Sequence, residues 1–176
     1  MLEPIDIIQA IDAFKSVYEF LKEIKKFLDK SKKGGWNLLS SKKTETMERK
    51  FNEALMGTKN AIESCIWYGK GFAIAEECGS KVDKSFHELM GLLISQFNDI
   101  SMKLDPRKLD KKLIDHLVGQ LKILENYAQR FWNIQGISSH RHKEKDTMKI
   151  IEDFRSRLWD FKRSMEPYLK PETSTC

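Results

Sequence analysis

The sequence predicts an all-α protein, built as an antiparallel helical bundle of four to five long amphipathic helices. Apolar residues recur at spacings of three and four in five separate stretches, the pattern of amphipathic helices. Only 9 glycines and 4 prolines occur in 176 residues, whereas all-β folds need many turns. A hydrophobic fraction of 40% with 32% charged residues suits one core with a polar surface. We expect residues 1–170 to form a single helical-bundle domain and residues 171–176 a flexible tail.

The clearest predicted helix covers residues 5–31. Its acidic start and lysine-rich end complement the helix dipole. Its apolar residues follow an a/d pattern over three heptads, namely Ile7, Ala10, Phe14, Val17, Leu21, Ile24 and Leu28. The following stretch, 31–44, contains Gly34-Gly35, which disfavours a helix. It is predicted to be a long loop or a short amphipathic turn.

The second helix is predicted from about Glu45 to Tyr68, with one further turn at 72–75. The third is predicted to follow Ser80 as its N-cap, with Asp83 three residues later. Both carry one apolar stripe and one charged face. The sequence therefore predicts two more elements that bury one side only.

The fourth helix is predicted to begin at Asp105-Pro106, as an N-cap followed by a proline in the first turn. Residues 138–142 are expected to form the loop after it. The fifth helix has its apolar stripe from Met148 to Met165 and is expected to stop near Pro167. Short loops after the third and fourth helices predict antiparallel neighbours.

The strongest charge feature is the lysine-rich segment, residues 22–43. Eight lysines face only Glu23 and Asp29 there, so the segment has a net charge of +6 in a chain of +5. Clusters of four to eight basic residues are typical of contact with anionic lipid, and a tryptophan beside them suits a membrane–water interface. A solvated helix end, with the tryptophan capping the bundle, is the alternative. The predicted lipid-binding residues are Lys22, Lys25, Lys26, Lys30, Lys32, Lys33, Trp36, Lys42 and Lys43.

Catalytic and metal-binding patterns are weak throughout the sequence. Cys65 lies on an apolar stripe and is expected to be a small buried hydrophobe, while Glu76-Glu77 before Cys78 would raise the pKa of its thiol. His140 and His142 flank Arg141 without an acid or cysteine to complete a ligand set. Phosphate-cradling glycine loops are missing too. We expect no enzymatic activity, no metal and no cofactor.

The expected location is the cytoplasm, with recruitment to the plasma membrane. The first residues lack the basic region of a secretory signal, and no apolar run approaches the ~18 residues of a membrane-spanning helix. Three cysteines at unrelated spacings are typical of reduced thiols.

Several stretches of the chain carry a family resemblance. The N-terminal four-helix bundle of the mixed lineage kinase domain-like pseudokinases is similar to residues 48–55, 61–63, 72–75 and 82–94, and to IIEDFRSRLWDFKRSMEPYLKP at 150–171. The central stretch is also similar to the helical domains of plant helper immune receptors. The opening MLEPIDIIQAIDAF resembles the start of fungal HeLo-type cell-death domains.

The resemblance implies an executioner domain of regulated cell death or innate immunity. Such a domain oligomerises, engages acidic phospholipids through basic residues and permeabilises the membrane. Two alternatives remain open: a cytosolic adaptor bundle that docks a partner helix, and a small helical subunit of a nucleoprotein complex. The latter is disfavoured because no nucleic-acid-reading motif accompanies the lysines.

Overall fold

A computed structural model describes most of the chain beyond residue 40. The described ranges are 41–67, 71–108, 110–133 and 140–172. Eight earlier residues are also described and are helical; we call them the N-terminal segment, comprising Lys15, Tyr18, Glu19, Leu21, Lys22, Glu23, Lys25 and Lys26. They agree with the predicted first helix. Phe14 and the other apolar residues of that stripe, apart from Leu21, lie outside the described residues.

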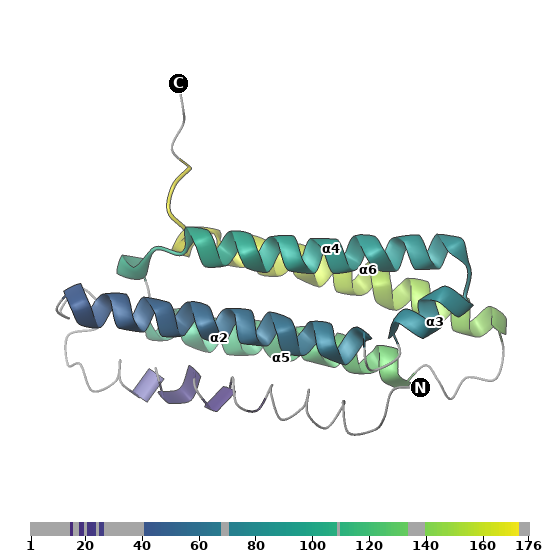
Figure 1. Cartoon of the computed structure of the whole chain (residues 1–176), viewed down its shortest axis with the longest axis horizontal. Helices are drawn as coiled ribbons and strands as arrows, with labels where there is room; N and C mark the ends of the chain where they lie inside the picture. Colours follow the sequence, from purple (N-terminus) through teal and green to yellow (C-terminus); the bar gives the residue numbers. More distant parts are fainter. Residues whose placement is uncertain are drawn as a thin grey trace.

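Four long helices form two layers: α2 (Ser41–Trp67), α4 (Ser80–Lys103), α5 (Lys111–Asn133) and α6 (His140–Met165). Helices α4 and α6 make one layer, and α2 and α5 make the other, with the N-terminal segment beyond it (Figure 1). Helix α2 also packs on α4, and α5 on α6. The prediction of an all-α helical bundle is confirmed.

The order of the helices around the bundle is less regular than expected. Helices α5 and α6 are antiparallel neighbours, as predicted. Helices α4 and α5 also run in opposite directions, but they lie diagonally across the core instead of side by side. Within its layer, α4 lies beside the parallel helix α6, because the turn between α4 and α5 crosses the end of the bundle (Figure 1).

Helix α2 begins at Ser41, so the prediction that residues 41–44 belong to a loop is wrong. Residues 41–44, Ser-Lys-Lys-Thr, contain neither glycine nor proline, so their sequence does not oppose a helix that starts at Ser41. The predicted turn at 72–75 is part of α3 (Gly71–Glu77). A Cβ at residue 71 would lie 2.6 Å from the Ile66 carbonyl oxygen, so glycine permits this close approach of α3 to α2.

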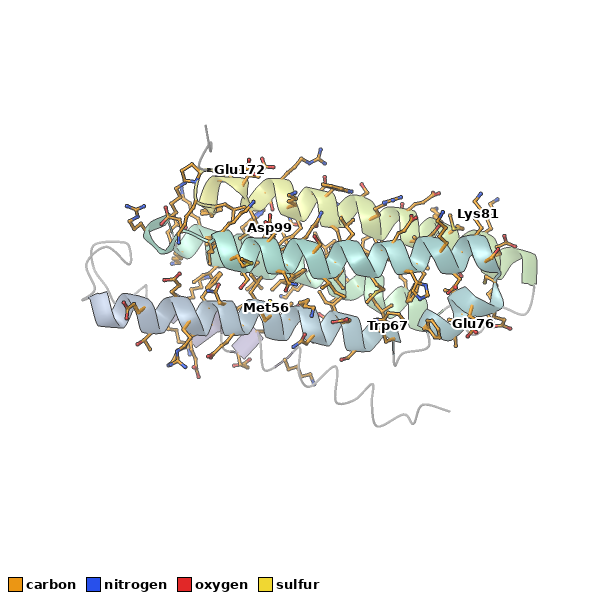
Figure 2. The ribbon with its side chains drawn as sticks, turned by 45° about the horizontal axis from the view of Figure 1, so that its top comes forward. Met56, Trp67, Glu76, Lys81, Asp99 and Glu172 are labelled. Carbon is orange, nitrogen blue, oxygen red and sulfur yellow. The ribbon has the colours of Figure 1, made fainter. Side chains whose placement is uncertain are left out.

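The ends of α2 and α3 meet α4 through aromatic rings. Trp67 and Phe86 form an edge-to-face pair with centroids 5.3 Å apart, and Phe72 lies 5.2 Å from Trp67. Such pairs add to the stabilisation that comes from burial alone. Trp67 lies at the C-terminal end of α2, beside α3 in Figure 2, so this cluster joins α2, α3 and α4 where the chain turns from one helix to the next.

The N-cap of α4 is Gly79 and not Ser80, which corrects the prediction by one residue. Gly79 has φ of 109°, a left-handed value that glycine adopts without strain, and the cap has no side-chain hydrogen bond. Helix α5, by contrast, begins later than predicted. Asp105 and Pro106 begin only the short 3-10 helix η2 (Pro106–Lys108), and Asp110 caps α5 by accepting the Leu113 N–H at 2.8 Å.

Helix α6 begins at His140, so the prediction that residues 140–142 belong to a loop is wrong for the backbone. The turns that follow provide Met148 and Ile151, whose packing on the core supports an extended helix start. The helix ends at Met165 and is followed by the 3-10 turn η4 (Glu166–Tyr168), which agrees with the expected stop near Pro167. Of the predicted tail, only residues 171 and 172 are described.

The core is aliphatic and aromatic along its length. Its largest fully buried side chains include Phe51, Phe86, Phe97, Phe154 and Phe161. Phe97 of α4 and Phe161 of α6 stack with centroids 5.2 Å apart. The predicted apolar stripes of α2, α4, α5 and α6 therefore supply this core.

Candidate functional site

Of the lysines predicted to bind lipid, three have side chains that the structure describes. Lys22 and Lys26 are exposed, while Lys25 is half-buried. Residues 42 and 43 lie in the first turn of α2, but their side chains lie outside the described part of the chain. The predictions for Lys30, Lys32, Lys33 and Trp36 also fall outside it.

Two of these three lysines have intramolecular partners. Lys22 Nζ lies 3.2 Å from Glu19 Oε1, one turn earlier on the same exposed face. Lys25 Nζ pairs with Asp115 Oδ1 of α5. Lys25 therefore attaches the segment to the bundle, whereas Lys22 and Lys26 present charge to solvent. An exposed ion pair such as Lys22–Glu19 is worth about 0–1 kcal/mol and is easily exchanged for another partner.

The N-terminal segment lies antiparallel to α5, because Tyr18 contacts residue 125 while Lys25 contacts residue 115. Tyr18 Oη donates a hydrogen bond to Glu125 Oε2 at 2.9 Å, and Lys122 Nζ lies 5.8 Å from the Tyr18 ring centroid. Burial, and next the Glu125 carboxylate, raise the pKa of Tyr18. Leu21 between these contacts is 1% exposed. One apolar anchor and two polar contacts thus fix the described part of this segment.

A second group of lysines, which the sequence reasoning missed, lies at the end of the bundle that holds η2. We call it the η2-end groove; it is lined by Lys103, Lys108, Lys162 and Lys170, with Asp99, Glu166, Leu169, Pro171 and Glu172. Asp99 and Glu172 lie at this end in Figure 2. A signal was present in the sequence, because residues 103–112, KLDPRKLDKK, carry five basic residues against two acids.

The charges of the η2-end groove are largely compensated. Lys103 Nζ lies 3.1 Å from Asp99 and 3.6 Å from Glu172, and both carboxylates, Asp99 first, raise the pKa of Lys103. Lys108 Nζ donates to the Leu169 carbonyl at 3.1 Å. Ammonium groups near the ends of α4 and α6 also complement the negative ends of those helix dipoles. The lysines of this groove therefore serve chiefly to cap helix ends and to hold the C-terminal residues against α4 and η2.

Large apolar side chains reach solvent at two described positions. Met102 near the end of α4 is 81% exposed, and Trp159 on α6 is 45% exposed. Lys162 Nζ lies 5.4 Å from the Trp159 ring centroid, within the range of a cation–π contact. Single exposed apolar residues of this kind are normal on protein surfaces.

Cys78 is a buried free thiol, 8% exposed. Burial raises the pKa of its thiol most, and Glu77 adds to the rise. The hydrogen bond that Cys78 Sγ donates to Thr147 Oγ1 and the charge of Lys143 lower it. The predicted direction is confirmed, but its main cause is burial and not the neighbouring carboxylates. Cys65 lies on α2 with its side chain outside the described residues. Within the described ranges, no three His, Cys, Asp or Glu side chains gather as a metal site would require.

Comparisons with family models, with curated proteins and with solved structures found no match to this chain. None of the helices, so far as the described residues define them, has the apolar length needed to cross a membrane. The functional argument therefore depends on the charges and contacts described above.

Proposed function

We propose that this protein is a membrane-targeting, oligomerising helical bundle that binds acidic phospholipids and permeabilises membranes in regulated cell death or innate immunity. The observation that carries the proposal is the net charge of +6 over residues 22–43. Lysines near an anionic leaflet contribute about 1 kcal/mol each, so even partial engagement of the segment supports binding. In this proposal the protein is cytoplasmic and is recruited to the plasma membrane.

The contacts of the N-terminal segment suggest how the charge would be used. Lys22 and Lys26 are exposed on a segment in which Tyr18 and Lys25 contact α5 and Leu21 is buried. A single bundle would bind weakly, and self-association would raise the effective concentration of lysines at the surface. The amphipathic stripe from Ile7 to Leu28 would then insert its apolar face.

The decisive experiment is charge reversal with a matched control. Lys25 is left unchanged because Lys25→Glu would place two carboxylates together at Asp115. The test variant carries Lys22→Glu, Lys26→Glu, Lys32→Glu and Lys33→Glu, which takes residues 22–43 from +6 to −2. The control makes the same charge change at exposed lysines of α4 and α6 near their starts, with Lys81→Glu, Lys84→Glu, Lys145→Glu and Lys149→Glu.

The expected result is loss of pelleting with acidic liposomes and of dye release in the test variant, while the control retains both. Binding of the unmodified protein should weaken steeply between 0.1 M and 1 M salt, because the Debye length falls from about 10 Å to about 3 Å. Equal binding by the two variants would contradict the proposal, as would salt-insensitive binding. Circular dichroism of both variants verifies that the helices persist.

One observation favours the alternative of an adaptor bundle. A shallow groove runs along α2, lined by Glu45, Glu48, Arg49, Asn52, Glu53 and Met56. In an adaptor bundle this groove would be the place where a partner helix docks. If the unmodified protein ignores acidic liposomes, this adaptor function becomes the better proposal. A DNA and RNA gel-shift assay run in parallel tests the nucleoprotein alternative.

A further inference from the structure

The seam between α4 and α6 is fastened at both ends. At one end Lys143 Nζ lies 2.8 Å from Glu77 Oε2, just before α4 begins. At the other end Leu104 and Leu169 form an isolated β-bridge, in which the Lys170 N–H donates to the Lys103 carbonyl at 2.7 Å. The seam therefore cannot separate end to end without breaking backbone hydrogen bonds.

Gln96 lies in the C-terminal half of α4, seven residues before the end that carries the β-bridge. Asp99 and Lys103, three and seven residues later on the same side of α4, line a groove together with Lys162 of α6. Glu88, eight residues earlier, forms an ion pair with Arg155 of α6 at 3.7 Å. Gln96 therefore faces α6, beside the stacked rings of Phe97 and Phe161.

The amide of Gln96 is buried without compensation. Its side chain is 3% exposed, and neither Oε1 nor Nε2 has a hydrogen-bond partner among the described residues. Other buried polar side chains differ: Thr58 Oγ1 donates to the Ala54 carbonyl at 2.9 Å, and Thr147 Oγ1 to the Lys143 carbonyl at 2.6 Å. A buried amide that lacks partners destabilises the closed state relative to any state in which water reaches it.

We propose that the α4–α6 seam opens locally and transiently around Gln96, and that Gln96 is the residue that lowers the free energy of this opening. Because the ends are fastened, the opening breaks backbone hydrogen bonds in the turns of the two helices around Gln96 and leaves the helix ends in place. Local openings of this kind are cooperative units that fall below global unfolding in free energy. The opened state exposes the faces of Phe97 and Phe161. The inference depends on the fold and not on the proposed membrane function.

Native-state hydrogen exchange of the full chain tests the proposal. In the unmodified protein, amides of residues 93–100 and 154–161 should exchange at least tenfold faster than the slowest amides of α5. In Gln96→Leu the exchange of those two stretches should slow by about tenfold, which corresponds to about 1.4 kcal/mol. The melting temperature should rise by about 4 °C, as removal of a buried unsatisfied group predicts for a chain of this length.

Two further variants guard the test against the case in which the new leucine of Gln96→Leu packs poorly. Gln96→Met retains an unbranched side chain of similar length, so it should reproduce the effect if Gln96→Leu packs poorly. Thr58→Val is the matched control, because it removes a buried polar group that already has a hydrogen-bond partner, and it should not raise the melting temperature. The proposal is overturned if the amides of residues 93–100 and 154–161 exchange only through global unfolding. It is also overturned if neither Gln96 variant slows the exchange of these amides.

Discussion

Helix α5 contacts the N-terminal segment quite differently from the way α4 contacts α6. The α4–α6 pair buries the stacked rings of Phe97 and Phe161, with backbone hydrogen bonds beyond one end and, at the other, an ion pair between Lys143 of α6 and Glu77 of α3. The described residues of the N-terminal segment include one buried leucine, and they contact α5 through a tyrosine hydrogen bond and a partly exposed ion pair. The first contact is part of the core, whereas the second is an attachment to its outside.

The difference matters for function because charge and stability occupy different parts of the chain. Burial of large side chains contributes most of the free energy of folding, and exposed charges contribute little. The lysine-rich segment can therefore carry a net charge of +6 without its charges having to be neutralised within the core. Substitutions in the core should therefore lower the free energy of unfolding much more than substitutions of the exposed charges.

The largest expected loss is for Phe161→Ala, which removes a fully buried ring stacked on Phe97. Deleting such a ring costs about 3–5 kcal/mol in the free energy of unfolding, through lost burial and the cavity left behind. Urea denaturation followed by circular dichroism measures it. Trp159→Ala on the same helix is the control, because that ring is 45% exposed and its loss should cost under about 1 kcal/mol.

A smaller loss is expected for Leu21→Ala. Leu21 is 1% exposed, so the range for buried leucines, about 2–5 kcal/mol, applies. We expect the lower end of that range, because a segment on the outside of the bundle can shift to fill the space. Urea denaturation of the same kind measures the change. An unchanged midpoint would mean that this segment does not contribute to the cooperative core.

The sequence predicted the helices well because their signal is local and repeated. Buried residues of α4 such as Val82, Phe86 and Leu93 recur at helical spacing, and each period reinforces the last. Helix starts were harder to predict. Ser80 has the chemistry of an N-cap, but Gly79 holds the left-handed backbone at that position, and Asp110 rather than Asp105 caps α5.

The candidate site could be predicted only in part. A run of lysines is visible in the sequence, but the pairing of Lys25 with Asp115 joins residues 90 apart, which no local pattern reveals. The diagonal placement of α4 and α5 follows from the packing of four helices at once. The same limit applies to Gln96, because its position on the stripe beside Phe97 does not show whether the fold supplies a partner for its amide.

Tyr18→Phe probes the polar half of the attachment to α5. It removes the hydrogen bond to Glu125, and we expect a loss of about 1 kcal/mol at pH 7, typical of one part-buried hydrogen bond. The variant should also change how the free energy of unfolding falls at alkaline pH. Because the folded state raises the pKa of Tyr18, this group's contribution is complete below its unfolded pKa of about 10 and is lost as pH rises above it.

Thermal melts of the unmodified protein and Tyr18→Phe between pH 8 and pH 11 measure this effect. The unmodified protein should lose more stability over that interval than the variant, since only it must ionise residue 18 on unfolding. Parallel curves in the two proteins would show that Tyr18 is not held neutral by burial and Glu125. Tyr168→Phe is a suitable control, because it removes one tyrosine from the opposite end of the described chain.

The smallest expected effect on stability is that of Lys25→Ala. The Lys25–Asp115 pair joins the N-terminal segment to α5, but the Lys25 side chain is 35% exposed and the Asp115 side chain 54%. Exposed pairs contribute about 0.2–1 kcal/mol and weaken in salt, so the loss should be below about 1 kcal/mol at 0.1 M salt and vanish near 1 M. A double-mutant cycle with Asp115→Ala, followed by urea denaturation at both salt concentrations, isolates the coupling. A coupling above 2 kcal/mol that persists at 1 M salt would instead make this pair a structural part of the bundle, and the separation of charge from stability would fail at Lys25.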